Sequence, residues 1–156
     1  MPKKYGIEAK LAETTDKLNQ FQVEHLKDLV LKHLKKDKKV PILGLAYKPN
    51  TPVIEESASI KLIDELLKHN MDITVYDPLA MDNTKEIYGD KIKYASSMEE
   101  CLSASANWIL ALPYDQFKSI DSATIAHNPT IIIDCWRMLE PEKLGQKVKY
   151  IPLGKS

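Results

Sequence analysis

Two cationic side chains follow apolar runs of the kind that form buried strands. Lys48 comes just after the run 40–46, and Arg137 comes just after the run 130–134. In open α/β sheets, ligands bind beyond the carboxyl ends of parallel strands. Ser57 is placed to begin a helix at the same edge, and a helix N-terminus attracts anions. These residues predict a site for a phosphate or pyrophosphate, the plainer alternative being two solvated cations.

The loops that usually bind nucleotides in such folds are missing from the sequence. Gly44 is the only glycine near the end of the first apolar run, so there is no G-x-G-x-x-G and no G-x-x-x-x-G-K-[ST]. Asp77 ends the second predicted strand, where an NAD-binding domain would place its ribose carboxylate. The interpretation favoured for Asp77 is an Asp-Pro turn whose carboxylate binds its own backbone.

Neither a catalytic nucleophile nor a metal site is expected. Cys101 and Cys135 are predicted to be small, buried free thiols, although Arg137 stands close enough in sequence to lower the pKa of Cys135. The four histidines fall on different predicted elements and share no metal-ligand spacing. Catalysis therefore cannot be assembled from the residues of this chain alone.

The pattern of apolar residues sets the expected order of elements. A long helix is predicted over 14–34, followed by an alternation of strands and short helices. Strands are expected at 40–46, 73–76, 92–94, 108–112, 130–134 and marginally 150–153, with helices from Ser57, over 97–102 and within 114–126. This order predicts an α/β fold with a doubly wound, mostly parallel Rossmann-like sheet, helices on both faces and one long helix in front.

Composition narrows the class of protein. The chain has 156 residues, about one domain, with 22 basic and 22 acidic side chains and a formal net charge of zero. That balance argues against nucleic acid or an anionic membrane as the main partner. No apolar run approaches the length of a membrane span, and the N-terminus lacks a secretory core. A cytoplasmic protein is expected.

Several segments together resemble one family. Residues 42–51, the pair Glu56-Ser57 and residues 75–78 resemble the C-terminal domain of the UDP-glucose/GDP-mannose dehydrogenase family. That family usually shows G-[LF]-[AS]-[FY]-K-x-x-T-x-D-x-R-E-S and then [VI]-Y-D-P. Residues 134–137 resemble its D-x-x-R segment, and residues 18–22 resemble the N-x-x-Q of its central helix.

The resemblance implies a division of labour between two halves. Such enzymes oxidise the C6 alcohol of a nucleotide sugar to a carboxylate in two NAD-dependent steps, with NAD bound mainly by an N-terminal half that this chain lacks. Tyr47, Lys48 and Arg137 would then bind the UDP-sugar. Residues 1–38 would belong to the central connecting helix and residues 39–156 to the nucleotide-sugar-binding domain. The helix 14–34 would pair two copies in a homodimer.

Departures from the family pattern keep an alternative open. Glu55 stands where the family has an arginine that reaches NAD, and Pro52 and Val53 replace acidic residues. The segment that carries the catalytic cysteine has no counterpart. The expected function is the UDP-sugar-binding domain of an NAD-dependent nucleotide-sugar 6-dehydrogenase, not catalytic alone. The alternative is a non-enzymatic nucleotide-sugar-binding module or an inactive remnant, and the sugar itself is left open.

Overall fold

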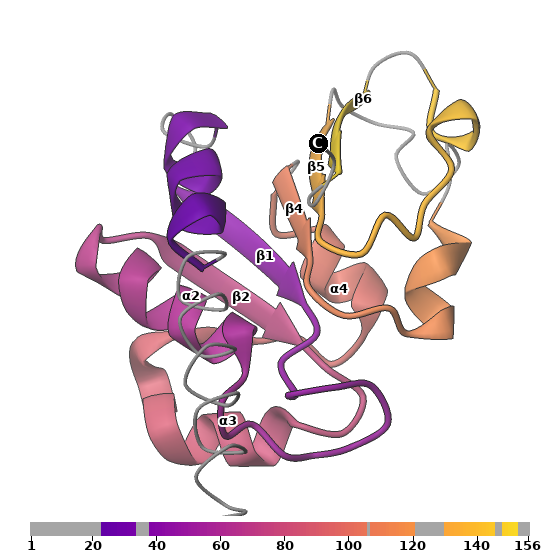
Figure 1. The fold of residues 1–156 in the computed structure, drawn as a ribbon. Helices are drawn as coiled ribbons and strands as arrows, with labels where there is room; N and C mark the ends of the chain where they lie inside the picture. Colours follow the sequence, from indigo (N-terminus) through magenta and orange to yellow (C-terminus); the bar gives the residue numbers. More distant parts are fainter. Residues whose placement is uncertain (1–22, 34–37, 106, 121–129, 146–147, 153–156) are drawn as a thin grey trace, which may run out of the picture.

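The centre of the fold is a fully parallel sheet. The computed structural model describes residues 23–33, 38–105, 107–120, 130–145 and 148–152. Six strands lie in the order β3-β2-β1-β4-β5-β6, and every described pair is parallel (Figure 1). Their bounds are β1 Lys39–Leu43, β2 Asp72–Tyr76, β3 Lys93–Tyr94, β4 Asn107–Leu110, β5 Thr130–Asp134 and β6 Val148–Pro152. The expected doubly wound α/β fold is confirmed.

Helices cover both faces of this sheet. The chain moves outward from β1 through α2 (Ala58–Lys68) and α3 (Met81–Tyr88) to β3, then returns through α4 (Met98–Leu102) to β4. Because such crossovers are right-handed, the outward and returning connections lie on opposite faces. The hydroxyl of Tyr88 joins the first two helices by donating to Asp64 of α2 at 2.7 Å. Three 3-10 turns complete the fold, η1 Gly89–Lys91, η2 Asp115–Ser119 and η3 Pro141–Lys143.

The predicted leading helix is described in part. Residues 23–33 are helical, while residues 14–22 and 34 lie outside the described ranges. Val23, Leu26 and Val30 are buried, at the three- and four-residue spacing of one helix face. This single stripe packs within the domain, because Leu26 and Val30 belong to its main apolar cluster.

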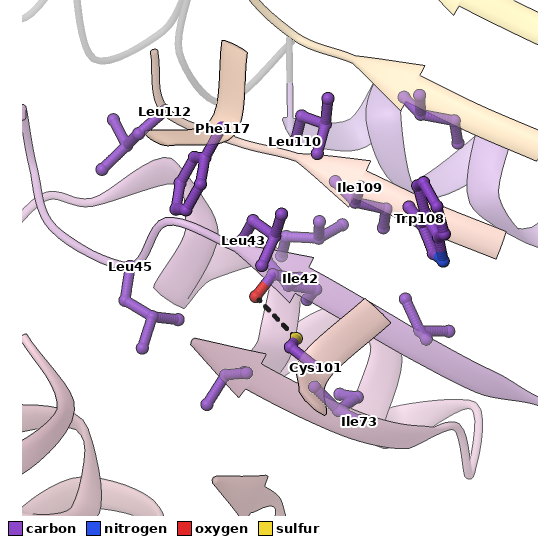
Figure 2. Close-up of a cluster of buried hydrophobic side chains, with 14 of the residues drawn as sticks. Ile42, Leu43, Leu45, Ile73, Cys101, Trp108, Ile109, Leu110, Leu112 and Phe117 are labelled. Carbon is purple, nitrogen blue, oxygen red and sulfur yellow. Dashed lines mark hydrogen bonds between the residues drawn. The ribbon is translucent and has the colours of Figure 1, made fainter. Parts of the chain in front are cut away.

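The core lies on the two central strands. Ile42, Leu43, Ile109 and Leu110 are fully buried, as expected for strands covered on both faces (Figure 2). Cys101 of α4 packs against them, with its Sγ 3.8 Å from the Ile42 carbonyl oxygen. Burial raises the pKa of the Cys101 thiol to about 12, which confirms the prediction of a buried, inert thiol.

Several elements differ from the sequence prediction: the strands expected at 40–46 and 108–112 end earlier, at Leu43 and Leu110. Helix α3 was not expected, and β6 starts at Val148 instead of residue 150. Of the predicted helical stretch 114–126, the described part forms only the turn η2, and residues 121–129 lie outside the described ranges. None of the helices in the described part of the chain has the length and apolar character that crossing a bilayer requires.

Candidate nucleotide-binding edge

The loop after β1 presents two of the predicted site residues. Tyr47 and Lys48 are both exposed, Tyr47 by 54% of its surface. The loop folds back on itself, because the Tyr47 N–H donates to the Val53 carbonyl at 2.7 Å and Asn50 adopts a left-handed φ of 66°. The two side chains therefore project from a closed loop.

The base of this loop is attached to the start of α2. Ser57 caps the helix as predicted, since its Oγ accepts from the Ile60 N–H at 3.4 Å. The same hydroxyl donates to the Leu45 carbonyl at 2.7 Å, and Ser59 donates to the Gly44 carbonyl at 2.7 Å. Both serines are buried, so the helix N-terminus and the strand end are held as one unit.

Asp77, at the end of β2, organises the same edge. Its carboxylate accepts hydrogen bonds at 2.8–3.2 Å from the backbone N–H groups of Leu45, Ala46, Leu79 and Ala80. The Tyr114 hydroxyl donates to it as well, at 3.3 Å. The bonds from residues 79 and 80 confirm the predicted turn, and the other three connect β2 to the loops that follow β1 and β4.

These contacts bear on where NAD would bind. Asp77 is 1% exposed and its two oxygens already accept five hydrogen bonds, so its carboxylate is not offered to a ribose. Gly44 is the only glycine from residue 44 to 57, which leaves no glycine-rich approach for a pyrophosphate. The described residues of this edge therefore do not fit the dinucleotide in the manner of an NAD-binding sheet.

A second buried carboxylate, Asp134, holds the loop that carries Arg137. It accepts from the Trp136 N–H at 3.0 Å, from the Leu139 N–H at 3.0 Å and from the Tyr150 hydroxyl at 2.7 Å. Arg137 itself is exposed and adopts a left-handed φ of 51°, which is uncommon for a residue with a side chain. The Asp134 network thus fixes both sides of a strained turn whose tip is cationic.

The strand order brings the predicted cations to one edge without placing them side by side. Lys48 follows β1 and Arg137 follows β5, with β4 between these two strands. The ends of β1 and β5 are two strand spacings apart, roughly 10 Å. Among the residues that the structure describes, neither cation forms an ion pair. Both positive charges are therefore available to an anionic ligand.

Glu55 faces different surroundings. With Glu56 and Glu86 it lines an open groove of about 390 Å³ that also touches Ile60 and Ile87, on the side of α2 and α3. Glu56 pairs with Lys61 at 3.2 Å, and no ion pair involves Glu55 among the described residues. Three glutamates and one lysine supply the charged side chains of this groove, so its lining is unsuited to the phosphates of a dinucleotide.

The remaining thiol near the site is also unreactive. Cys135 is free and half-buried; burial, together with the nearby Asp134 carboxylate, raises its pKa to about 12. Arg137 therefore does not activate it. Within the described ranges, no group of three or more His, Cys, Asp or Glu side chains is placed to hold a metal ion. The described residues of this edge therefore offer no thiolate nucleophile.

Sequence reasoning missed several residues that shape this edge. Tyr114, Trp136 and Tyr150 were not singled out, and Asp134 was noted only as part of a motif. Each acts through contacts with distant residues, as when the Trp136 indole donates to the Ala111 carbonyl at 2.9 Å, 25 positions away. The one available signal was a polar aromatic residue beside a strand end, which is too common to be selective.

Comparison with known proteins identifies the domain. A model of the UDP-glucose/GDP-mannose dehydrogenase family, UDP binding domain, matches residues 41–141. The chain belongs to this family. The match runs from β1 through the loop after β5, so it contains every residue of the edge described above except Tyr150.

The relatives of this UDP-binding domain are longer proteins. UDP-glucose 6-dehydrogenase AglM of Haloferax volcanii is 35% identical over 135 residues, which cover 86% of this chain and 31% of that protein. UDP-glucose 6-dehydrogenase YwqF of Bacillus subtilis is 27% identical over 153 residues, 94% of this chain and 34% of that one. The chain thus spans about a third of the length of the curated relatives it matches.

A solved structure shares the fold. The UDP-glucose dehydrogenase from Pyrobaculum islandicum superposes with a TM-score of 0.74 at 23% identity. The superposition covers 96% of this chain and 33% of that one. The UDP-binding domain therefore has the architecture of the corresponding third of that enzyme.

Proposed function

We propose that this UDP-binding domain binds a UDP-sugar through Tyr47, Lys48 and Arg137. It would serve as the C-terminal part of an NAD-dependent dehydrogenase that oxidises the sugar C6 alcohol to a carboxylate. One observation carries the proposal: two exposed cations without ion pairs among the described residues stand at the edge where a parallel sheet binds its ligand.

The geometry suits the diphosphate of such a ligand. Lys48 follows β1 and Arg137 follows β5, on opposite sides of β4 in the sheet, so a diphosphate bound at this edge would be approached by a cation from each side. Lysine supplies a mobile point charge, whereas the planar guanidinium supplies paired N–H donors. Tyr47 precedes Lys48 on the same exposed loop and adds a phenolic hydroxyl for the sugar or ribose.

The chemical step requires groups from outside the described residues. The oxidation needs a hydride acceptor, which NAD supplies when bound, and the edge described here does not fit NAD. Burial raises the pKa of both thiols to about 12, so both are protonated at neutral pH. The role proposed for this domain is to hold the nucleotide sugar while a separate NAD-binding half acts on its C6 carbon.

A thermal-shift titration tests the site directly. UDP or UDP-glucose should raise the melting temperature by about 3–5 °C once the ligand is tenfold above its Kd, because it binds only the folded state. Lys48→Ala and Arg137→Ala should each lose most of that shift. Lys91→Ala is the matched control, since Lys91 is exposed in η1 at the opposite, amino edge of β3.

Other ligands separate the alternatives. UDP-N-acetylglucosamine and GDP-mannose report which base and sugar are preferred, and NAD should give no shift. Stabilisation by NAD that survives both alanine variants would contradict the proposal, as would equal uridine-nucleotide shifts in all variants. Glu55 favours the second candidate, a non-enzymatic module that binds the same UDP-sugar, because its acidic groove opposes cofactor phosphates.

We also propose that two copies pair through the predicted helix 14–34. Within residues 23–33 the buried stripe belongs to this domain's own packing and is not available to a second copy, so the test is directed at residues 14–22. Leu18 and Phe21 are the large apolar residues there. Sedimentation at low and high protein concentration should show a dimer for the wild type and a monomer for a Leu18→Glu, Phe21→Glu variant. A wild type that is monomeric throughout would contradict this assignment.

A further inference from the structure

Trp136 is held in an exposed position at the nucleotide-binding edge. Its side chain leaves 56% of the residue's surface open, the largest value among the exposed large hydrophobic residues that the structure describes. Two hydrogen bonds fix it: its backbone N–H donates to Asp134 at 3.0 Å, and its indole Nε1–H donates to the Ala111 carbonyl at 2.9 Å. Trp136 is thus exposed, while both its backbone and its indole are held by hydrogen bonds.

The anchoring directs the indole toward the ligand crevice. Trp136 follows β5, while Ala111 follows β4, so the ring reaches from one strand end to the next. The crevice of this sheet lies between β1 and β4, where the chain turns outward in opposite directions. Trp136 therefore leans from the Arg137 loop toward the loop that carries Lys48.

Other large apolar side chains are exposed on the loops that follow the strands. Among the described residues, the structure exposes five large hydrophobic side chains, and four of them follow strands: Tyr47, Val53, Leu79 and Trp136. The fifth, Ile87, lies on α3. Trp136 differs from the other four because its ring is fixed across the ends of two neighbouring strands, β5 and β4.

We infer that the open face of Trp136 receives the uracil ring of the bound nucleotide. This inference rests on the proposed function, which places the diphosphate at Lys48 and Arg137. Arg137 is the next residue, so a base on the indole stays within reach of a phosphate on the guanidinium. The indole N–H is already bonded to Ala111, so the flat ring face is what remains for a ligand. Aromatic faces stack on nucleobases with little preference among bases.

The emission of Trp136 provides the test, since the chain has two tryptophans. Trp108 is 5% exposed and its indole is bonded to main-chain carbonyls, so long-wavelength emission belongs to Trp136. UDP should quench that emission, whereas pyrophosphate and ribose 5-phosphate should not. Trp136→Ala should raise the Kd of UDP about tenfold and leave the Kd of pyrophosphate unchanged. Leu79→Ala, exposed at the same edge, is the matched control and should bind UDP as the wild type does.

Trp136→Phe separates stacking from anchoring, because it keeps an aromatic face and removes the N–H. We expect it to bind UDP nearly as well as the wild type. If it binds as weakly as the alanine variant, or if pyrophosphate binding falls equally, Trp136 acts only by holding the Arg137 loop and the inference is wrong. A third outcome is that UDP binding needs Lys48 and Arg137, leaves Trp136 emission unchanged and is unaffected by replacing Trp136. The inference then fails and the proposed function stands. Absence of UDP binding in the wild type overturns both.

Discussion

Replacing Gly44 with alanine should lower the free energy of unfolding by about 4 kcal/mol, a large part of the roughly 5–15 kcal/mol that stabilises a typical domain. Gly44 has a φ of 102°, a conformation that side chains rarely adopt. An added Cβ would lie 2.7 Å from the Leu112 Cβ and 2.9 Å from the Leu112 backbone nitrogen. Because one of these atoms is backbone, the clash cannot be relieved by turning a side chain, and β1 must move away from the segment after β4.

Gly89→Ala is the matched control for this substitution. Gly89 also has a positive φ, 52°, but an added Cβ would meet nothing within 4 Å. It should therefore show only the backbone strain, about 1–2 kcal/mol. Urea unfolding followed by circular dichroism measures both variants. Equal losses of stability would show that the approach of Gly44 to Leu112 is not as close as described.

Asp77→Ala is expected to cost about 3–5 kcal/mol of unfolding free energy. The substitution removes the acceptor for four backbone N–H groups and the Tyr114 hydroxyl, and several of these donors are buried. A buried donor that loses its partner keeps the cost of having left water. The stability of Asp77→Asn should lie between those of the wild type and Asp77→Ala. In this variant one carboxylate oxygen still accepts hydrogen bonds, but the other is replaced by an NH₂ group that faces N–H donors.

Asp82→Ala provides the comparison for Asp77. Asp82 is exposed in the first turn of α3, where a negative charge contributes about 0.5 kcal/mol through the helix dipole. Urea unfolding should separate the two alanine variants by several kcal/mol. Amide hydrogen exchange offers a second readout, since the N–H groups of Leu45 and Ala46 should lose protection in Asp77→Ala. A difference in stability below about 1 kcal/mol would contradict the role given to Asp77.

Much of the fold could be predicted from local sequence. The central strands are continuous apolar runs between turn residues, which is the pattern expected of strands that are buried on both faces of a parallel sheet. Helix α3 could not be predicted in this way, because among its eight residues only Thr84 and Tyr88 are buried and its N-cap, Ala80, makes no side-chain bond. That helix is defined by contacts outside itself, such as the bond from Tyr88 to Asp64 on α2.

In the candidate site too, some features follow from local sequence and others depend on contacts between distant residues. Lys48 and Arg137 could be proposed from sequence because their place depends only on where strands end. The anchoring of Trp136 depends on a hydrogen bond to a residue 25 positions away in the sequence. The hydrogen bond from Tyr114 to Asp77 joins residues 37 positions apart. No local pattern encodes such pairs. Asp77 lies between these cases: its turn was predictable, and its bonds to Leu45 and Ala46 were not.

Asp77 and Asp134, the two buried carboxylates, hold the loops at this edge in place and so allow the exposed loop residues to vary. Asp77, directly after β2, binds the backbone of the loop after β1, and the loop after β5 that Asp134 holds reaches the segment after β4 through Trp136. In both halves of the sheet, residues at the end of one strand thus hold the start of the loop after its neighbour. The end of β2 holds the loop after β1, and the end of β5 holds the segment after β4. Pro52, Val53 and Glu55 have exposed side chains that take no part in these bonds, so they can be replaced while the frame persists. Loop tips taken from relatives with other sugar preferences should therefore graft onto this scaffold without refolding it.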